Sequence, residues 1–223
     1  MTLSVGFLPP IVALRKVHSP FSGMASSEKV SRLYKQHPRE STMSNITLAE
    51  VVSFWREAGP ERWFRKDKNF DLTIRSRFLA THEIAARGEF AALEESQDGA
   101  LALVILLDQF PRNIFRGSAH AFATDPLARA VANRALARGF DQTIDEMMRP
   151  FFYLPFMHSE LPADQDRSVR LHEALGDTER LRYAAIHRDI VAKFGRFPHR
   201  NRVMGRDTTP PEQEFLDGGG FAG

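Results

Sequence analysis

Residues 98–116 read DGALALVILLDQFPRNIFR, and this stretch decides the fold. From Leu101 to Leu107 almost every residue is apolar, which is typical of a helix that is buried on all sides. A buried strand has the same pattern, but no other segment of the chain offers a partner strand. The run is far shorter than the roughly 20 residues that cross a bilayer. We therefore expect a buried core helix that ends near Phe110, because Pro111 lacks a backbone donor and restricts the residue before it.

The polar end of this helix carries the first candidate site. Asp108 lies four residues after Val104 and seven after Leu101, so it shares the buried face of the helix. Desolvation and the negative end of the helix dipole both disfavour a carboxylate there, so Asp108 needs a cation or several donors. The candidate cations are Arg112, Arg196 and Arg200. Two interpretations stay open at this stage, namely a structural ion pair and a carboxylate that faces a ligand.

A second stretch, residues 194–201, reads FGRFPHRN and repeats the composition of residues 108–116. Both combine aromatic residues, a proline, an Asn and guanidinium groups, a mixture suited to a fixed, half-buried polar site. Guanidinium groups beside Asn amides recognise carboxylates and phosphates, although the same groups also cap helix ends. The candidate ligand-binding residues of the two stretches are Asp108, Gln109, Arg112, Asn113, Arg196, His199, Arg200 and Asn201.

Three residues are weaker candidates for acid–base catalysis. His158 and Glu160 lie two residues apart after an aromatic run, which suits proton transfer or a corner of a metal site. His187 shares a helix face with Ile190 and Val191, where a histidine is more often a core residue than a base. No spacing matches an established metal-ligand motif, and no loop has the pattern that cradles phosphates. We therefore expect no metal site, and the sequence leaves the cofactor open.

Capping residues, glycines and prolines predict the other helices. We expect them at 47–58, at 71–88 with Asp71 as the cap, at 125–137, from 141 into the aromatic run 151–154, at 163–175, at 177–194 with Asp177 as the cap, and at 211–216. Helices with short connectors and almost no strand signal predict an all-α fold. We expect one helical domain over residues 46–217, followed by a flexible end at 218–223.

The charge of the chain is unevenly distributed. Residues 1–45 carry six Lys or Arg and two Glu, a net charge of 6 − 2 = +4, so the remainder carries 2 − 4 = −2 because the whole chain sums to +2. The sequence pI of about 9.1 therefore reflects this extension and not the helical domain. Without a basic face on that domain, we expect no nucleic-acid partner.

The basic extension, residues 1–45, has no sustained periodicity, and four prolines interrupt its short apolar runs. We predict that it is disordered. A transit peptide and a translation start at Met24 or Met43 are both compatible with its composition. The chain has no cysteine, which excludes disulfides and thiolate sites and agrees with a reducing, cytoplasmic compartment. Because its longest apolar run is too short to cross a bilayer, we expect no membrane partner.

Three motifs in the same order resemble a bacterial family catalogued as domain of unknown function 924. They are residues 106–113 (LLDQFPRN), 154–160 (LPFMHSE) and 194–201 (FGRFPHRN), and the resemblance covers about residues 47–216. It implies a tetratricopeptide-like, right-handed array of antiparallel helix pairs without an established activity. Members usually have Leu-Glu before the His of the second motif, where this chain has Phe156 and Met157. The matched polar positions are Asp108, Gln109, Arg112, Asn113, His158, Glu160, Gln165, Arg196, His199, Arg200 and Asn201.

Three functions fit these observations. The first is binding of a small anionic metabolite or a peptide carboxylate in a pocket with Arg, His and Asn side chains. The second is a hydrolase-like or transferase-like enzyme in which His158 or His187 is the general base and Arg196 with Arg200 stabilises negative charge. The third is a scaffold for protein partners in which the polar motifs are internal ion pairs. The sequence leaves the oligomeric state open.

Overall fold

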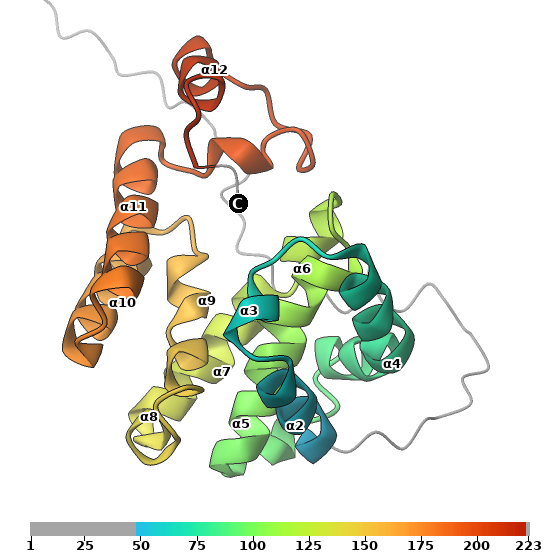
Figure 1. Cartoon of the computed structure of the whole chain (residues 1–223). Coiled ribbons are helices and arrows are strands. Elements are labelled where there is room, and N and C mark those ends of the chain that lie inside the picture. The colour runs from blue at the N-terminus through green and yellow to red at the C-terminus, as the bar shows by residue number, and fades with distance from the viewer. Residues whose placement is uncertain (1–47, 222–223) are drawn as a thin grey trace, which may run out of the picture.

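The computed structural model describes residues 48–221, and the predictions for residues 1–45 lie outside them. The described residues form helices and turns without a strand, which confirms the predicted all-α fold. The buried apolar run forms α5 (Gln97–Val104) and the segment η2 (Ile105–Gln109), at the centre of the main core. Helix α5 packs against α2 (Leu48–Ala58) and α7 (Asp125–Ala137) (Figure 1).

The prediction that the central helix ends before Pro111 is wrong. The segment η2 is a single π-helical turn, and the chain continues without a break into α6 (Phe110–Ile114). The Phe110 N–H bonds to the Ile105 carbonyl five residues back, instead of four. This wider turn accommodates Pro111, whose ring would collide with the carbonyl four residues before it in a regular helix. The proline therefore reshapes the helix and does not stop it.

The first helices pack their aromatic side chains beside the central helix. Helix α3 (Pro60–Trp63) follows α2, and Trp63 donates through Nε1 to the Trp55 carbonyl at 2.6 Å. Helix α4 (Lys68–Ala86) begins earlier than predicted. Its N-cap is Asp67, which accepts two backbone N–H groups, so the predicted cap Asp71 is wrong by one turn. The side chain of Asp71 instead accepts a hydrogen bond from Asn113 of α6.

The middle of the chain is more broken than the sequence predicts. Short turns η1 (Ala91–Glu95) and η3 (Ala119–Phe122) precede α5 and α7 respectively. In place of one helix from 141 to 154, the structure has α8 (Phe140–Thr143), η4 (Arg149–Phe152) and α9 (Leu154–Met157). Pro150 and Pro155 each occupy the start of a new helical turn, because a residue without an N–H fits there and not in a helix interior. The aromatic run is thus buried in short turns.

The last helices agree closely with the predicted ranges. Helix α10 (Pro162–Leu175) and helix α11 (Thr178–Phe194) lie side by side (Figure 1). Asp177 caps α11 as predicted, through bonds from the N–H groups of Glu179 and Arg180. The turn η5 (Pro198–Arg200) and α12 (Pro210–Asp217) follow. A tetratricopeptide-like array remains a prediction from the family resemblance.

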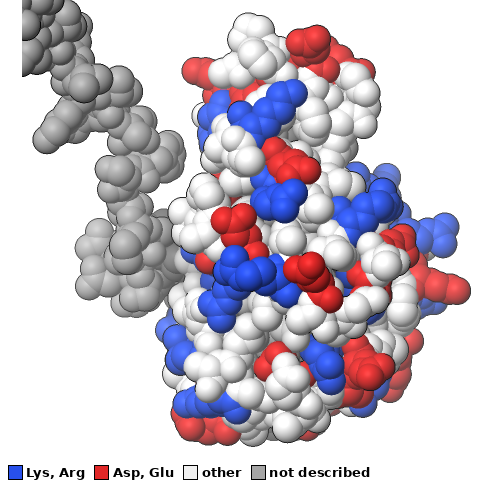
Figure 2. Space-filling view, turned by 90° about the vertical axis from the view of Figure 1, so that its left-hand side faces the viewer, with Lys and Arg blue, Asp and Glu red and all other residues white. Residues whose placement is uncertain are grey.

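A small second cluster supports this last part of the chain. Ile190, Val191 and Phe197 form its buried centre, separate from the main core. Phe221, within the stretch predicted to be flexible, packs its ring 4.5 Å from that of His187. No helix in residues 48–221 is long and apolar enough to span a bilayer. Figure 2 shows acidic and basic side chains interspersed over one face of the molecule.

Candidate functional site

The π-helical turn leaves backbone carbonyls that side chains must satisfy. In an α-helix the N–H at position 111 would bond to the Leu107 carbonyl, four residues back, and in a π-helix to the Leu106 carbonyl, five residues back. Pro111 has no N–H, so neither carbonyl receives this bond. His82 Nδ1 bonds to the Leu106 carbonyl at 2.8 Å, and Thr124 Oγ1 donates to the Leu107 carbonyl at 2.6 Å. These contacts hold the π turn between α4 and α7. They fix the orientation of the next residue, Asp108.

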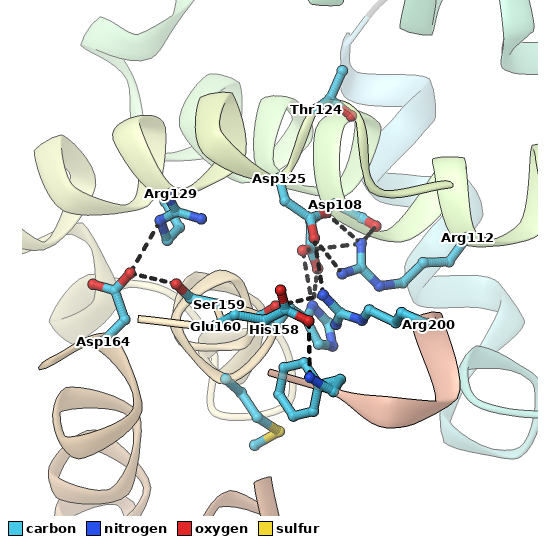
Figure 3. A network of polar contacts seen from close by, with 12 residues as sticks. Asp108, Arg112, Thr124, Asp125, Arg129, His158, Ser159, Glu160, Asp164 and Arg200 are labelled. Atoms are coloured by element: carbon cyan, nitrogen blue, oxygen red, sulfur yellow. Dashed lines mark hydrogen bonds and ion pairs between the residues drawn. The ribbon is translucent and has the colours of Figure 1, made fainter. Parts of the chain in front are cut away.

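Asp108 is the centre of the polar network in Figure 3, and none of its side chain is exposed. Its Oδ1 and Oδ2 atoms lie 2.8 and 3.0 Å from Nδ1 of His158. Gln109 donates to Oδ2 at 2.5 Å. Nη1 of Arg112 lies 3.2 Å from Oδ1 and also donates to the Asp108 carbonyl at 2.5 Å. The buried carboxylate of Asp108 thus has a cation and several hydrogen-bond donors, as its place on the buried helix face predicted.

The charges in the network determine the protonation of Asp108 and His158. Burial alone would raise the pKa of Asp108, but Arg112, His158 and Gln109 outweigh it and lower the pKa to about 2. Burial, together with the nearby Arg112 guanidinium, lowers the pKa of His158 despite the attraction of Asp108. At neutral pH the pair is therefore an ionised carboxylate beside a neutral imidazole. Since an ionised carboxylate only accepts hydrogen bonds, Nδ1 of His158 carries the proton.

His158 presents its second ring nitrogen away from Asp108. The Nε2 atom has no hydrogen-bond partner in residues 48–221, and it is not among the fully enclosed polar atoms. The side chain as a whole is 15% exposed. An imidazole that donates through Nδ1 and leaves Nε2 unprotonated has an available proton acceptor.

The loop that carries His158 is held by side chains from α10 and η5. Gln165 is completely buried and donates through Nε2 to the carbonyls of Met157 and Ser159, at 2.7 and 2.5 Å. Arg200 donates to the carbonyl of His158 itself at 3.0 Å. Backbone and ring are both fixed, which is the arrangement that precise proton transfer requires.

A second carboxylate, Asp125, extends the network to α7. It accepts two parallel bonds from Arg112, of 2.9 and 3.1 Å. Its Oδ2 atom also lies 3.9 Å from Nη1 of Arg200. Figure 3 shows the side chains of Asp108, Asp125, Arg112, His158 and Arg200 converging from separate elements. The two carboxylates and two guanidinium groups sum to zero charge beside a neutral His158.

Glu160 lies next to this network but has its own cation. Arg206 donates to both of its oxygens, at 2.7 and 3.0 Å, and the Phe197 N–H donates to Oε1 at 2.8 Å. Burial would raise the pKa of Glu160, but these donors lower it. Glu160 therefore ties the His158 loop to η5. It has no direct contact with His158 that would make it the partner of the imidazole.

The other predicted site residues lie in different surroundings. Asn113 donates to Asp71, together with Arg116. Arg196 and Asn201 both contact Glu212 of α12. His187 and His199 flank the ring of Phe197, and burial lowers their pKa values to about 3 and about 4. Of the predicted residues, those that meet at one place are Asp108, Gln109, Arg112, His158 and Arg200.

Asp125 and Phe122 are part of the site but were not predicted. The sequence identifies Asp125 only as the start of a helix, and Phe122 only as an aromatic residue in a connector. The ring centroid of Phe122 lies 4.5 Å from the Arg200 guanidinium carbon. No spacing signal links either residue to the two motifs, because the contact depends on how η3 packs against α6 and how α7 packs against η2.

Comparisons with known proteins support one family. A model described as "Bacterial protein of unknown function (DUF924)" matches residues 51–220. A solved structure, described as a protein of unknown function ATU0120 from Agrobacterium tumefaciens, is 50% identical with a TM-score of 0.75. The match covers 77% of this chain and 97% of that one. No curated protein is significantly similar. The resemblance read from the three motifs is confirmed, and the chain belongs to the DUF924 family of bacterial proteins.

Proposed function

We propose that the protein is an enzyme in which His158 is the general base and Asp108 orients it. The observation that carries this proposal is the 2.8 Å contact between Nδ1 of His158 and a fully buried Asp108, with Nε2 left unbonded. Burying an ionised carboxylate is costly, and such an arrangement occurs where an imidazole must be held in one tautomer. The lowered pKa of His158 keeps the ring in its basic form at neutral pH.

The chemistry that follows is activation of an oxygen nucleophile. Nε2 takes a proton from water or a hydroxyl group, and the oxygen lone pair attacks an acyl or phosphoryl centre. Asp108 stabilises the imidazolium that forms, and the same proton then passes to the leaving group. Arg200, which contacts the His158 carbonyl, supplies positive charge near the ring. The substrate in this proposal is small and anionic, as the two Arg-rich motifs led us to expect.

The arrangement favours His158 over the other predicted base, His187. Nδ1 of His187 bonds to the Tyr183 carbonyl within its own helix at 2.8 Å. Burial lowers the pKa of His187 to about 3, so its neutral ring packs against Phe197 and Phe221 of the second cluster. Among residues 48–221, no carboxylate is hydrogen-bonded to its ring. For Arg196, the bonds to Glu212 favour the scaffold interpretation of its motif.

The test is turnover of chromogenic acetate esters, anilides and phosphate esters by the full chain. His158→Gln and Asp108→Asn should each lower kcat/KM by about 10²–10⁴-fold. His120→Gln is the control, because His120 is exposed and contacts Ser118 rather than the network. Nitrogen NMR of His158 should show a proton on Nδ1 and none on Nε2 at pH 7. An imidazole protonated on Nε2 at pH 7, or turnover unchanged in His158→Gln, would contradict the proposal.

A further inference from the structure

Arginine side chains in this protein bind carboxylates repeatedly through one edge. The Nε and Nη2 atoms of Arg116 donate to Asp71 at 2.7 and 2.8 Å. The same two atoms of Arg196 donate to Glu212 at 2.6 and 2.8 Å, and Arg134 contacts Glu94 likewise. Two parallel bonds on one edge match the geometry of a planar carboxylate.

Arg200 has the same edge without a carboxylate. Its hydrogen bond to the described residues comes from Nη1, to the His158 carbonyl, and its Nε is enclosed without a partner. Nη2 has no partner either, and it is not enclosed, so this end of the edge reaches the surface. The side chain is only 7% exposed. A buried donor without an acceptor costs free energy that a bound acceptor would offset.

The charge of Arg200 is also poorly compensated. The carboxylate of Asp125 is 3.9 Å from Nη1, beyond hydrogen-bonding distance. Burial lowers the pKa of Arg200 to about 10 despite the attraction of Asp125, so the guanidinium is still charged at neutral pH. By contrast, Arg206 also has an enclosed Nε, but both of its Nη atoms bond to Glu160. Arg200 therefore keeps a charged edge that makes no bond to a carboxylate in residues 48–221.

Two aromatic rings lie against the guanidinium of Arg200. The ring centroids of Phe122 and Phe197 lie 4.5 and 4.4 Å from its guanidinium carbon. Because the guanidinium lies over the face of each ring, a ligand must approach Arg200 from a side that the rings leave open. In Figure 3 the guanidinium lies beside His158. A group bound on the Nε–Nη2 edge would lie on a guanidinium that already contacts the backbone of the residue carrying the proposed base.

We infer that the Nε–Nη2 edge of Arg200 binds a carboxylate group of the substrate. The inference rests on the proposed function, since it specifies the substrate on which His158 acts. A carboxylate adds one negative charge, whereas phosphate adds up to two beside the buried carboxylates of Asp108 and Asp125. The planar, singly charged group is therefore the better match. One carboxylate oxygen binds Nη2, the accessible end of the edge, and the second reaches the enclosed Nε when the side chains around it shift.

Arginine side-chain NMR of the full chain tests this directly, because the Nε–H signal of Arg200 reports on that edge. The probes are acetate, succinate, trialanine, trialanine amide and inorganic phosphate. Acetate, succinate or trialanine should shift the Arg200 signal, while the amide, which lacks the carboxylate, should not. Tighter binding of succinate would identify a free small acid, and tighter binding of trialanine a peptide C-terminus. An unmoved Arg200 signal, or tighter binding of phosphate than of every carboxylate, would overturn the inference.

Variants separate this inference from the proposed function. Arg200→Lys keeps the charge but removes the two-bond edge, and should weaken carboxylate binding about tenfold or more. Arg196→Lys is the matched control, because Glu212 already occupies that edge, and should bind as the wild type does. Unchanged binding in Arg200→Lys would overturn the inference. If the wild type shows no turnover but His158→Gln still binds carboxylates, the Arg200 site is supported and the proposed base is rejected. If turnover depends on His158 but the Arg200 signal does not respond to carboxylates, the proposed base is supported and the Arg200 site is rejected.

Discussion

The two motifs that pair Phe-Pro with Arg and Asn differ in the carboxylate that they engage. In the first, Asp108 comes from the motif itself, within a π turn, and holds a histidine whose second nitrogen is available. In the second, Arg196 and Asn201 meet Glu212, which belongs to the capping box of α12. Similar residue content therefore produces a candidate active site in one place and a clamp on a helix end in the other.

The difference lies in what each carboxylate leaves unsatisfied. Glu212 accepts bonds from Arg196, Asn201 and both the N–H and the hydroxyl of Thr209. All of these partners are internal, so Glu212 is satisfied without a ligand, although the enclosed Oδ1 of Asn201 has no partner in residues 48–221. Around Asp108, the internal partners fix His158 and leave its Nε2 free, and the same network includes Arg200 with an unbonded edge. The unbonded Nε2 of His158 and Nη2 of Arg200 are accessible, whereas the unbonded Oδ1 of Asn201 in the clamp is enclosed, and this distinguishes the site from the scaffold.

Exchange of each carboxylate for its amide should give the largest contrast. Asp108→Asn loses the charge that stabilises the imidazolium, so turnover of a chromogenic ester should fall by about 10²–10⁴-fold. Glu212→Gln should leave turnover per folded molecule unchanged, because Glu212 has no contact with the His158 network. The measurement is kcat/KM on both variants after circular dichroism has confirmed their helix content. Equal losses in both would mean that the two motifs do not differ in role.

Loss of Arg196 should affect stability and not turnover. The side chain of Glu212 is only 2% exposed, so Arg196→Ala leaves a buried carboxylate without its main cation. Because Arg196 itself is partly exposed, we expect the free energy of unfolding to fall by about 3 kcal/mol, which lowers the melting temperature by roughly 6–12 °C. The control is Arg188→Ala, which breaks an exposed pair with Asp189 and should cost at most about 1 kcal/mol. A change in melting temperature no larger than that of the control would show that the clamp is unimportant.

Mild acid should destabilise both regions through buried histidines. Burial lowers the folded-state pKa of His82 to about 4, while the unfolded value is near 6.5, so the unfolded chain binds a proton first as the pH falls. The stability that neutral, buried His82 contributes is fully present above pH 6.5 and is lost as the pH falls toward 4. His82 alone should account for about 2 kcal/mol between pH 7.5 and pH 5. Urea unfolding at several pH values measures this, and His82→Gln should flatten the profile.

The smallest effect we predict concerns the π turn itself. Thr124→Val removes the donor to the Leu107 carbonyl and should cost about 1–2 kcal/mol. Pro111→Ala restores an N–H at the position that would bond to this carbonyl in a regular helix, so Thr124→Val should cost less in that background. A double-mutant cycle should therefore give a coupling of about 0.5–1 kcal/mol. Strict additivity would mean that Pro111 does not account for the free carbonyl.

The fold was predictable to the extent that local signals determine it. The apolar run, the Asp177 cap and the helix of residues 125–137 each depend on neighbouring residues, and all three are confirmed. The π turn was not predictable, because a proline inside a helical pattern normally ends the helix. Its tolerance here depends on His82 and Thr124, which are distant in sequence.

The site was predictable as a set of residues more than as a geometry. The buried face of the central helix required donors for Asp108, and Arg112 is one of the three cations named. The pairing with His158 spans 50 residues and depends on the packing of α9, which no local pattern encodes. The clamp on Arg196 was missed for a similar reason, since Glu212 appears in the sequence only as part of a short final helix.

The location of the two tryptophans has a spectroscopic consequence. Trp55 and Trp63 stack with centroids 6.1 Å apart in the main core, and they are the only tryptophans of the chain. The second cluster, which anchors η5 and α12, contains none. Intrinsic fluorescence therefore follows the opening of the main core, while circular dichroism follows all helices. If the part that carries Arg200 opens first, the two signals will separate during unfolding, and the emission maximum will lag behind the loss of ellipticity.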